Sequence, residues 1–279
     1  MGNISLTAGM RQSLYSLQNT EQLMNRTASR LSSGKKVQTA LDDPINYFAA
    51  EGHRQRASDL SSRKDEMGEA VQLVKAGNNG IEAVTDLVAS AKSLAQSALS
   101  ASGTTEFNGL QEQFDELLTQ INELSDDAGY KGVNLMGGTD EKLEVSFDED
   151  GTHQVTLEGF DGSTAAGGLS IATVGPSGWD TAGVADTDAI NQSIDELDAA
   201  RTTLRSEAKT MANNLSTITI RQDFTSNMIN TLNDGADNLT LADMNEEGAN
   251  MLMLQTRQGL GTSSLSMASQ SAQSVLRLF

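Results

Sequence analysis

Few side chains in this sequence have the chemistry of a catalytic or metal-binding residue. The 279 residues include two histidines, His53 and His153, and no cysteine, so disulfides, thiolate metal sites and cysteine nucleophiles are excluded. Neither an HExxH pair nor a glycine-rich loop before Lys-Ser or Lys-Thr occurs, and these are the patterns of zinc peptidases and phosphate-binding loops. We therefore predict no catalytic residue, no cofactor and no enzyme activity.

The densest group of carboxylates is Asp148-Glu149-Asp150, which lies just before Gly151 and His153. Such a cluster could bind calcium, but the ligand spacing of an EF-hand loop is missing. Because runs of charge at a turn are usually solvated, we interpret the cluster as a turn and predict no metal site.

The formal net charge of −19 is distributed unevenly along the chain. Residues 1–64 carry nine basic and five acidic side chains, whereas residues 139–188 carry one basic and eleven acidic side chains. An acidic body repels phosphates, so no nucleic-acid partner is expected. No apolar run of about 18 residues occurs, so no membrane span is expected. The first six residues lack the basic and apolar regions of a cleaved signal peptide.

Two segments at the ends of the sequence carry apolar residues at alternating steps of four and three, which is a heptad pattern. It predicts one helix over residues 6–31 and another from about residue 244 to the end. Breaks at Ser32-Ser33-Gly34 and around Gly235 separate both helices from the rest. We predict that the two helices pair with each other and with further copies, through Met10, Leu14, Leu17, Met24, Leu31, Leu254, Leu265, Ala268, Ala272, Val275 and Phe279.

The middle of the sequence predicts long helices around a small β region. Apolar stripes indicate helices over residues 46–100, from a cap at Thr104 or Thr105 to about residue 129, and over residues 190–232. Glycines at 77 and 80 weaken the first of these. Alternating residues around Asp148 to Thr152 indicate a hairpin, and residues 169–173 a third strand. Residues 175–186 read as a loop.

The expected fold is mainly α with a small β region: an elongated antiparallel helical rod with coiled-coil seams, a β-hairpin segment and paired terminal helices. We place a terminal coiled-coil domain at residues 1–45 plus 235–279. A helical rod domain follows at residues 46–234 and includes the hairpin and loop region at 139–188. Two short helices joined only to each other bury little surface, so we expect them to become ordered on assembly.

The motifs at both ends resemble those of one family. The run Arg30-Leu31-Ser32-Ser33-Gly34-Lys35-Lys36-Val37, followed by Asp42-Asp43-Pro44, closely resembles the N-terminal signature of bacterial flagellins. Residues 110–124 and the run from Gly132 to Met136 look like the family's second long helix and its exit. Residues 261–263 and 270–276 are similar to its C-terminus. The likeness covers about residues 1–138 and 189–279.

The resemblance implies a structural subunit that self-assembles into the bacterial flagellar filament for motility, with the terminal helices forming the inner tube. It implies type III export and an extracellular location in the flagellum. The implied partners are further copies, the flagellar cap, hook-associated junction proteins, and an export chaperone at the C-terminal segment. In family members sensed by the Toll-like receptor for flagellin, an arginine and a glutamate lie where this chain has Ser90 and Gln113, while Lys92 and Leu94 fit the pattern. These four form a possible receptor-facing region.

Three other readings compete with a filament subunit. A hook–filament junction protein shares the same end helices but would not form long filaments alone. An enzyme inserted in the middle would need a histidine–carboxylate cluster, which residues 139–188 lack. A coiled-coil signalling protein would have no reason for end helices separated by breaks.

Overall fold

The computed structural model describes residues 8–175, 178–181 and 183–276. Within them the chain forms five helices: α1 (Ala8–Ser33), α2 (Pro44–Ala98), α3 (Thr104–Asp127), α4 (Thr187–Thr240) and α5 (Met244–Leu276). Four short strands form two antiparallel pairs: β1 (Lys142–Ser146) with β2 (Gln154–Glu158), and β3 (Asp180–Thr181) with β4 (Val184–Ala185). The predicted mainly α fold with a small β region is confirmed.

The chain divides into two compact units. The terminal unit contains the residues up to Gln55 and those from Thr231 onward, and the central unit contains Arg56–Asn230. The long helices α2 and α4 each contribute one part to either unit. The central unit therefore holds α3, the strands and the larger parts of α2 and α4.

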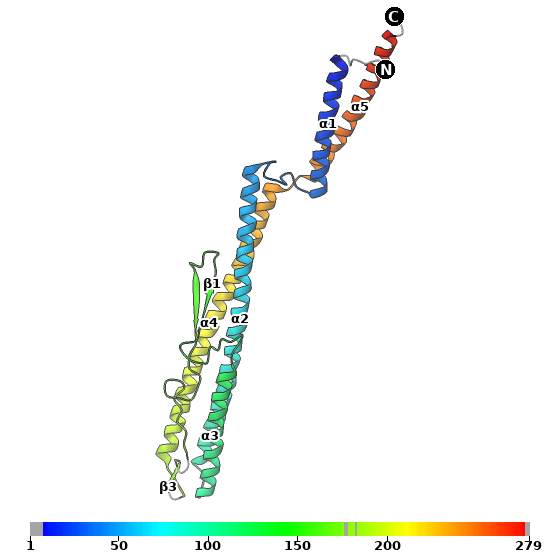
Figure 1. Cartoon of the computed structure of the whole chain (residues 1–279). Helices are drawn as coiled ribbons and strands as arrows, with labels where there is room; N and C mark the ends of the chain where they lie inside the picture. The colour runs from blue at the N-terminus through cyan, green and yellow to red at the C-terminus, as the bar shows by residue number, and fades with distance from the viewer. Residues whose placement is uncertain (1–7, 176–177, 182, 277–279) are drawn as a thin grey trace. The chain divides into compact units, whose positions relative to one another are not determined.

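In the terminal unit, α1 and α5 pack against each other in antiparallel directions (Figure 1). Arg30 Nη1 lies 2.8 Å from Glu247 Oε1. Almost four turns further along both helices, at about 3.6 residues per turn, a Cβ atom on Gly261 would lie only 2.8 Å from Leu17 Cδ2, so the glycine lets the helices approach. The predicted pairing of the terminal helices is confirmed.

Local signals explain where most helices begin and end. Gly34, with a φ of 70°, follows α1 in a left-handed conformation that favours glycine. Pro44 is the first residue of α2, and Asp43 Oδ1 accepts a hydrogen bond of 3.1 Å from Asn46 N. After α3, Asn134 Nδ2 donates to the carbonyl oxygens of Ser125 and Asp126, which the helix leaves unpaired.

Two predicted helix boundaries are wrong. The break expected around Gly235 does not occur, because α4 continues to Thr240. The chain turns at residues 241–243 instead, and Asp243 Oδ1 caps α5 by accepting a hydrogen bond of 2.8 Å from Asn245 N. At the start of α3, the cap position is Gly103 with a φ of 94°, not Thr104 or Thr105, and no side chain bonds there.

The two glycines near the middle of α2 are packing positions in an unbroken helix. A Cβ on Gly80 would lie 2.6 Å from Met136 Sδ and 2.7 Å from Ala128 Cβ. A Cβ on Gly77 would lie 3.1 Å from Met211 Sδ. The missing side chains let the segment after α3 pass close to α2. The glycines that were expected to weaken this helix are therefore sites of close packing.

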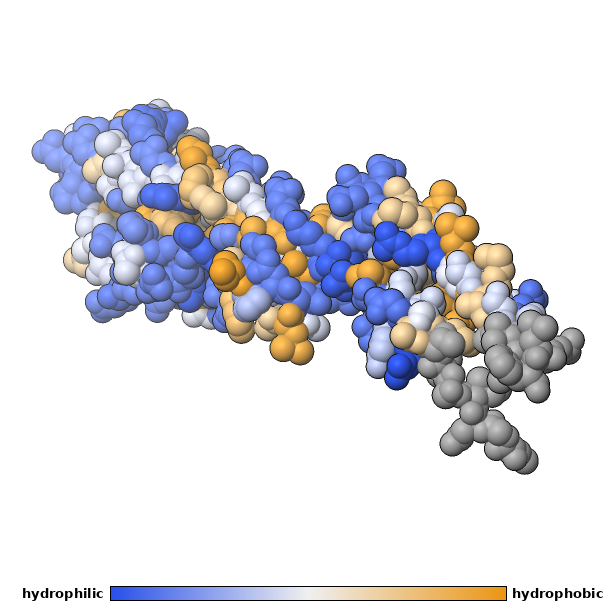
Figure 2. Space-filling view, turned by 90° about the horizontal axis from the view of Figure 1, so that it is seen from above, coloured by the Kyte–Doolittle hydropathy of each residue, from blue (hydrophilic) through white to orange (hydrophobic). Residues whose placement is uncertain are grey.

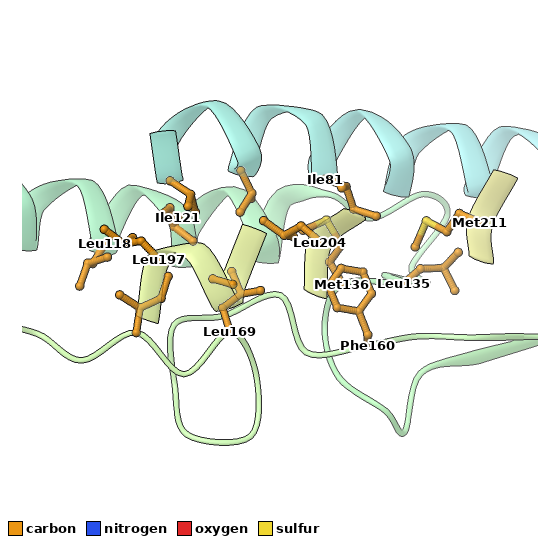
Figure 3. Close-up of a cluster of buried hydrophobic side chains, with 14 of the residues drawn as sticks. Ile81, Leu118, Ile121, Leu135, Met136, Phe160, Leu169, Leu197, Leu204 and Met211 are labelled. Carbon is orange, nitrogen blue, oxygen red and sulfur yellow. The ribbon is translucent and has the colours of Figure 1, made fainter. Parts of the chain in front are cut away.

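The core of the central unit lies between α2, α3, α4 and the segment that follows α3. Figure 3 shows part of this core as a row of buried side chains, with Leu118 and Ile121 of α3 near Leu197 of α4, and Ile81 of α2 and Leu204 of α4 near Met136. The largest side chain of the core is Trp179, which is fully buried. Its Nε1 donates to Ser193 Oγ at 3.1 Å, and its ring meets that of Phe114 edge to face, with centroids 4.9 Å apart.

The β region agrees with the sequence in part. The hairpin is confirmed, with Leu143 opposite Leu157 and Val145 opposite Val155. The third strand predicted at 169–173 is wrong. Leu169 and Ile171 are buried, but their N–H groups donate to the carbonyl oxygens of Ser163 and Thr164 within the same loop. The pair β3–β4 lies inside residues 175–186, which were expected to be irregular.

Candidate assembly surfaces

The face of α1 that meets α5 repeats every seven residues, as predicted. Every second predicted position holds, and the positions between them are shifted by one residue. Met10 is buried, and Leu17, Met24 and Leu31 are half-buried, as a seam requires. Leu14 is 38% exposed and lies outside the seam. The intervening buried positions are polar: Thr20 and Thr27.

Threonine can occupy this seam because its hydroxyl finds a partner within the helix. Thr20 Oγ1 donates to the carbonyl oxygen of Ser16 at 2.9 Å, which leaves its methyl group to pack. Sequence reasoning missed these positions because it scored only apolar residues. The signal that would have found them is the interval of seven between Thr20 and Thr27.

On α5 the predicted residues face α1. Leu254 is buried, and Leu265 and Ala268 are half-buried. The antiparallel register set by Arg30 with Glu247 brings Met24 level with Leu254, since both helices rise by about 1.5 Å per residue. Phe279 and the side chains of Ala272 and Val275 lie outside the described residues. The side chains of eight of the predicted residues lie in the described part of the chain, and all of them except that of Leu14 form a seam within one chain. Their contact with further copies stays a prediction.

A second apolar line runs along α5 on residues that the sequence analysis did not single out. Leu252, Met253, Leu260 and Met267 are each more than half exposed. Figure 2 shows hydrophobic side chains reaching the surface beside the grey termini, over the terminal helices. From residue 248 to 276 the helix carries a single charged side chain, Arg257. Contiguous exposed apolar surface of this kind is typical of a surface that binds another protein.

The connection between α1 and α2 and the first turn of α2 also display apolar side chains. Leu41 is 96% exposed and Ile45 is 81% exposed. The connection is held by Asp42, whose carboxylate accepts hydrogen bonds from Thr39 N, Gln38 N and Thr39 Oγ1. These bonds, the one from Thr39 N first, lower the pKa of Asp42 from its ordinary value. The Asp42-Asp43-Pro44 motif therefore builds a fixed turn.

A shallow groove of about 730 Å³ runs between α2 and α3 in the central unit. Half-buried Leu94 and Leu117 form its floor, and exposed glutamates at 112 and 116 lie on its rim. Three of the four residues of the predicted receptor-facing region line this groove: Ser90, Leu94 and Gln113.

The fourth residue, Lys92, does not line the groove. Its Nζ lies 2.5 Å from Asp198 Oδ1, so it joins α2 to α4. The structure therefore brings Ser90, Leu94 and Gln113 together and assigns Lys92 a contact on another face of α2. A role of the four residues in receptor binding stays a prediction.

The acidic turn and the histidines make ordinary contacts. Asp148 accepts hydrogen bonds from Thr152 Oγ1 at 2.5 Å and from His153 N at 3.2 Å, and His153 Nδ1 lies 2.7 Å from it. The bond from the Thr152 hydroxyl, and then those from His153, hold the pKa of Asp148 well below its ordinary value. Glu149 pairs with Arg56. His53 lies beside Gly235 on α4.

Over residues 8–175, 178–181 and 183–276, no three His, Cys, Asp or Glu side chains are grouped so that they could hold a metal ion. None of the helices in the same part of the chain is long and apolar enough to span a membrane.

Two family models match the chain, at its two ends. Residues 4–141 match the bacterial flagellin N-terminal helical region, and residues 187–279 match the bacterial flagellin C-terminal helical region. Together they cover α1, α2 and α3 on one side of the β region, and α4 and α5 on the other.

Full-length relatives agree with this match. Flagellin FljO of Caulobacter vibrioides is 28% identical over 100% of this chain and 99% of its own length. A flagellin of Brucella melitensis is 26% identical over 100% of this chain and 99% of its own length. The crystal structure of a Bacillus cereus flagellin superposes with a TM-score of 0.46 and 18% identity, over 57% of this chain and 88% of that chain.

The matches at both ends of the chain identify its family, and the paired end helices with their exposed apolar residues agree with that assignment. The chain belongs to the bacterial flagellin family, whose members are structural subunits of the extracellular flagellar filament.

Proposed function

We propose that this chain polymerises into the flagellar filament through its terminal unit, with the α1–α5 pair of each copy packing against those of its neighbours to form the inner tube. The exposed line of Leu252, Met253, Leu260 and Met267 on α5 carries this proposal. The α1–α5 pair buries one apolar seam within the chain, and this second apolar line on α5 remains exposed. Neighbouring copies would bury it and so offset the entropy of ordering the ends.

Flagellins are structural proteins, so the prediction that the chain is not an enzyme is confirmed by its family. Export to the outside of the cell and self-association follow from the same membership. The finer partners belong to the proposal: the flagellar cap, the hook-associated junction proteins, and an export chaperone at the C-terminal segment. So does the assignment of an inner-tube domain to residues 1–45 plus 235–279 and of a rod domain to residues 46–234.

Removing one terminal helix tests the proposal. Deletion of residues 1–31 or of residues 254–279 should leave a soluble monomer that no longer polymerises, because either change removes half of the α1–α5 pair. A full-length Leu254→Asp variant should behave in the same way, since it puts a charge on a buried seam position. Sedimentation and electron microscopy measure the polymer, and circular dichroism checks that the central helices remain. Filaments from either truncation would contradict the proposal.

Polymerisation of the unmodified chain distinguishes a filament subunit from a hook–filament junction protein. A filament subunit forms long filaments when concentrated alone, whereas a junction protein stays in short assemblies. The full-length matches to flagellins at both termini favour the filament subunit.

A further inference from the structure

The groove between α2 and α3 is lined with one sign of charge. The rim residues Glu112 and Glu116 are exposed and form no ion pair in the described structure. The helix that carries them, α3, has seven acidic side chains and no basic one. Gly109 also lines the groove, and the space beside it is open, since a Cβ there would meet nothing within 4 Å. The groove therefore combines an apolar floor, at Leu94 and Leu117, with an acidic edge.

On α4 the charge is of the opposite sign. Arg201, Arg205 and Lys209 are exposed at intervals of four residues, so they lie along one side of the helix. Among the described residues none of the three forms an ion pair or a hydrogen bond through its side chain. Glu82 and Asp86 of α2 line the same 290 Å³ groove as Arg201 and Arg205, yet no pair of these charges lies within ion-pair distance.

We propose that the basic stripe of one copy, Arg201, Arg205 and Lys209, docks into the acidic α2–α3 groove of a second copy. The proposal rests on the proposed function, since it names surfaces through which copies of a filament subunit meet. The spacings match: four residues of helix rise by about 6 Å, both between Glu112 and Glu116 and between successive basic residues. The aliphatic stems of arginine and lysine can cover Leu94 and Leu117 while their charged ends reach the glutamates.

The two surfaces are different, so the contact is heterologous and each copy offers one of each. A heterologous contact repeats from copy to copy, as a filament or ring requires, whereas a self-complementary contact stops at a dimer. The pairing would also reduce the electrostatic repulsion between copies of this acidic chain. Copies with a formal net charge of −19 repel one another unless opposite charges meet at the contact.

Charge reversal on full-length protein tests the contact. One variant carries Glu112→Lys and Glu116→Lys, and the other carries Arg201→Glu and Arg205→Glu. Each alone places like charges opposite each other, and the critical concentration for polymerisation should rise at least tenfold. In a 1:1 mixture every contact between the two different variants joins opposite charges, so copies that alternate along the polymer restore all contacts. A chain with all four changes restores opposite charges between copies of one kind. Both should polymerise within about threefold of the unmodified chain.

A control matched to the Glu112→Lys and Glu116→Lys variant carries Glu144→Lys and Glu158→Lys on the hairpin, which gives the same change in net charge on exposed residues outside both surfaces. It should polymerise like the unmodified chain. Circular dichroism melts identify any variant that has not folded, and the corresponding Gln variants, Glu112→Gln with Glu116→Gln, then give the same test with a smaller rise.

The inference is overturned if either reversed variant polymerises like the unmodified chain, or if folded variants regain nothing in the mixture and in the four-fold change. Failure of the unmodified chain to polymerise would contradict the proposed function, and this inference with it.

Discussion

The terminal and central units use the same helical periodicity but bury very different side chains. In the central unit the fully buried residues include several large ones: Trp179, Phe107, Phe114 and Leu118. In α1 the buried residues are Met10 and two threonines, Thr20 and Thr27. The central seam is closed by four elements, whereas the terminal seam is closed by two helices that expose a second apolar line.

This difference separates two sources of stability. Burial of a large apolar side chain contributes about 1.5–3 kcal/mol within one chain, and the central unit contains many of them. A pair of helices with small and polar seam residues gains much less, and isolated helices are marginal in water. We therefore expect the central unit to be stable by itself and the terminal unit to draw stability from neighbouring copies.

The largest expected effect comes from one substitution made in both units. Leu118→Ala in α3 should lower the free energy of unfolding of the monomer by about 2–5 kcal/mol, because it leaves a cavity in a closed core. Leu254→Ala in α5 should change the same transition by less than about 0.5 kcal/mol and should raise the critical concentration for polymerisation. Urea titration followed by the fluorescence of Trp179, which is the single tryptophan and lies in the central unit, measures the transition.

Equal losses of monomer stability from the two leucine substitutions would contradict the comparison, since the terminal unit would then be part of the same cooperative core. An unchanged critical concentration for Leu254→Ala would show that the α1–α5 seam does not contribute to polymerisation.

A smaller difference is expected between two glycines. Gly80→Ala should destabilise the monomer by about 1–3 kcal/mol, because the new methyl group overlaps Ala128 Cβ, which cannot rotate away. The methyl group of Gly261→Ala meets only Cγ and the two Cδ atoms of Leu17, a side chain that can turn, and alanine favours a helix by up to about 1 kcal/mol. Gly261→Ala should therefore leave the thermal midpoint unchanged or raise it. Differential scanning calorimetry compares the two variants, and a larger loss for Gly261→Ala would show that the terminal pair is the more tightly packed.

The periodic parts of the fold could be predicted from the sequence because the spacing of apolar residues shows which face of a helix or strand is buried. Met10, Leu17 and Met24 repeat at intervals of seven, and the structure places them on the face toward α5. The hairpin could be predicted for the same reason, since Val145 and Val155 alternate with polar neighbours; the structure shows that they lie opposite each other.

The errors arose where tertiary contacts outweighed a local signal. Gly235 costs a helix about 1 kcal/mol, yet α4 continues through it, with Ala236 fully buried on the next position. Leu169 and Ile171 alternate like a strand, but no neighbouring strand is available, and loop carbonyls accept their N–H groups.

The candidate surfaces were harder to predict than the helices that carry them. Nothing in a helical pattern tells that Leu94 faces α3 while Lys92, two residues earlier, pairs with Asp198 of α4. That distinction depends on how three helices surround one another. Likewise the basic stripe on α4 is visible in the sequence, but its lack of partners within the chain is visible only in the structure.

The smallest expected effect concerns two acidic turns, one in each unit, whose carboxylates are held in different ways. For Asp148 the Thr152 hydroxyl is the first cause of its lowered pKa, whereas for Asp42 the backbone N–H of Thr39 is the first cause and the Thr39 hydroxyl contributes less. Thr152→Val should therefore raise the pKa of Asp148 more than Thr39→Val raises that of Asp42. Carboxyl chemical shifts followed by NMR during acid titration of the monomer measure both values.

The sign of the pH effect follows from the direction of the shifts. A carboxyl whose pKa is lower in the folded chain than the unfolded value of about 3.9 stabilises the fold above that value, and this contribution is lost as the pH falls through the folded pKa. Both turns should therefore loosen only below about pH 4, and Thr152→Val should move the loosening of the hairpin turn to higher pH. If Thr39→Val shifted Asp42 as far as Thr152→Val shifts Asp148, side-chain donors would dominate both turns. If Asp42 instead titrated at its ordinary value in the monomer while Asp148 did not, the turn of the terminal unit would form only on assembly, as its α1–α5 pair is expected to do.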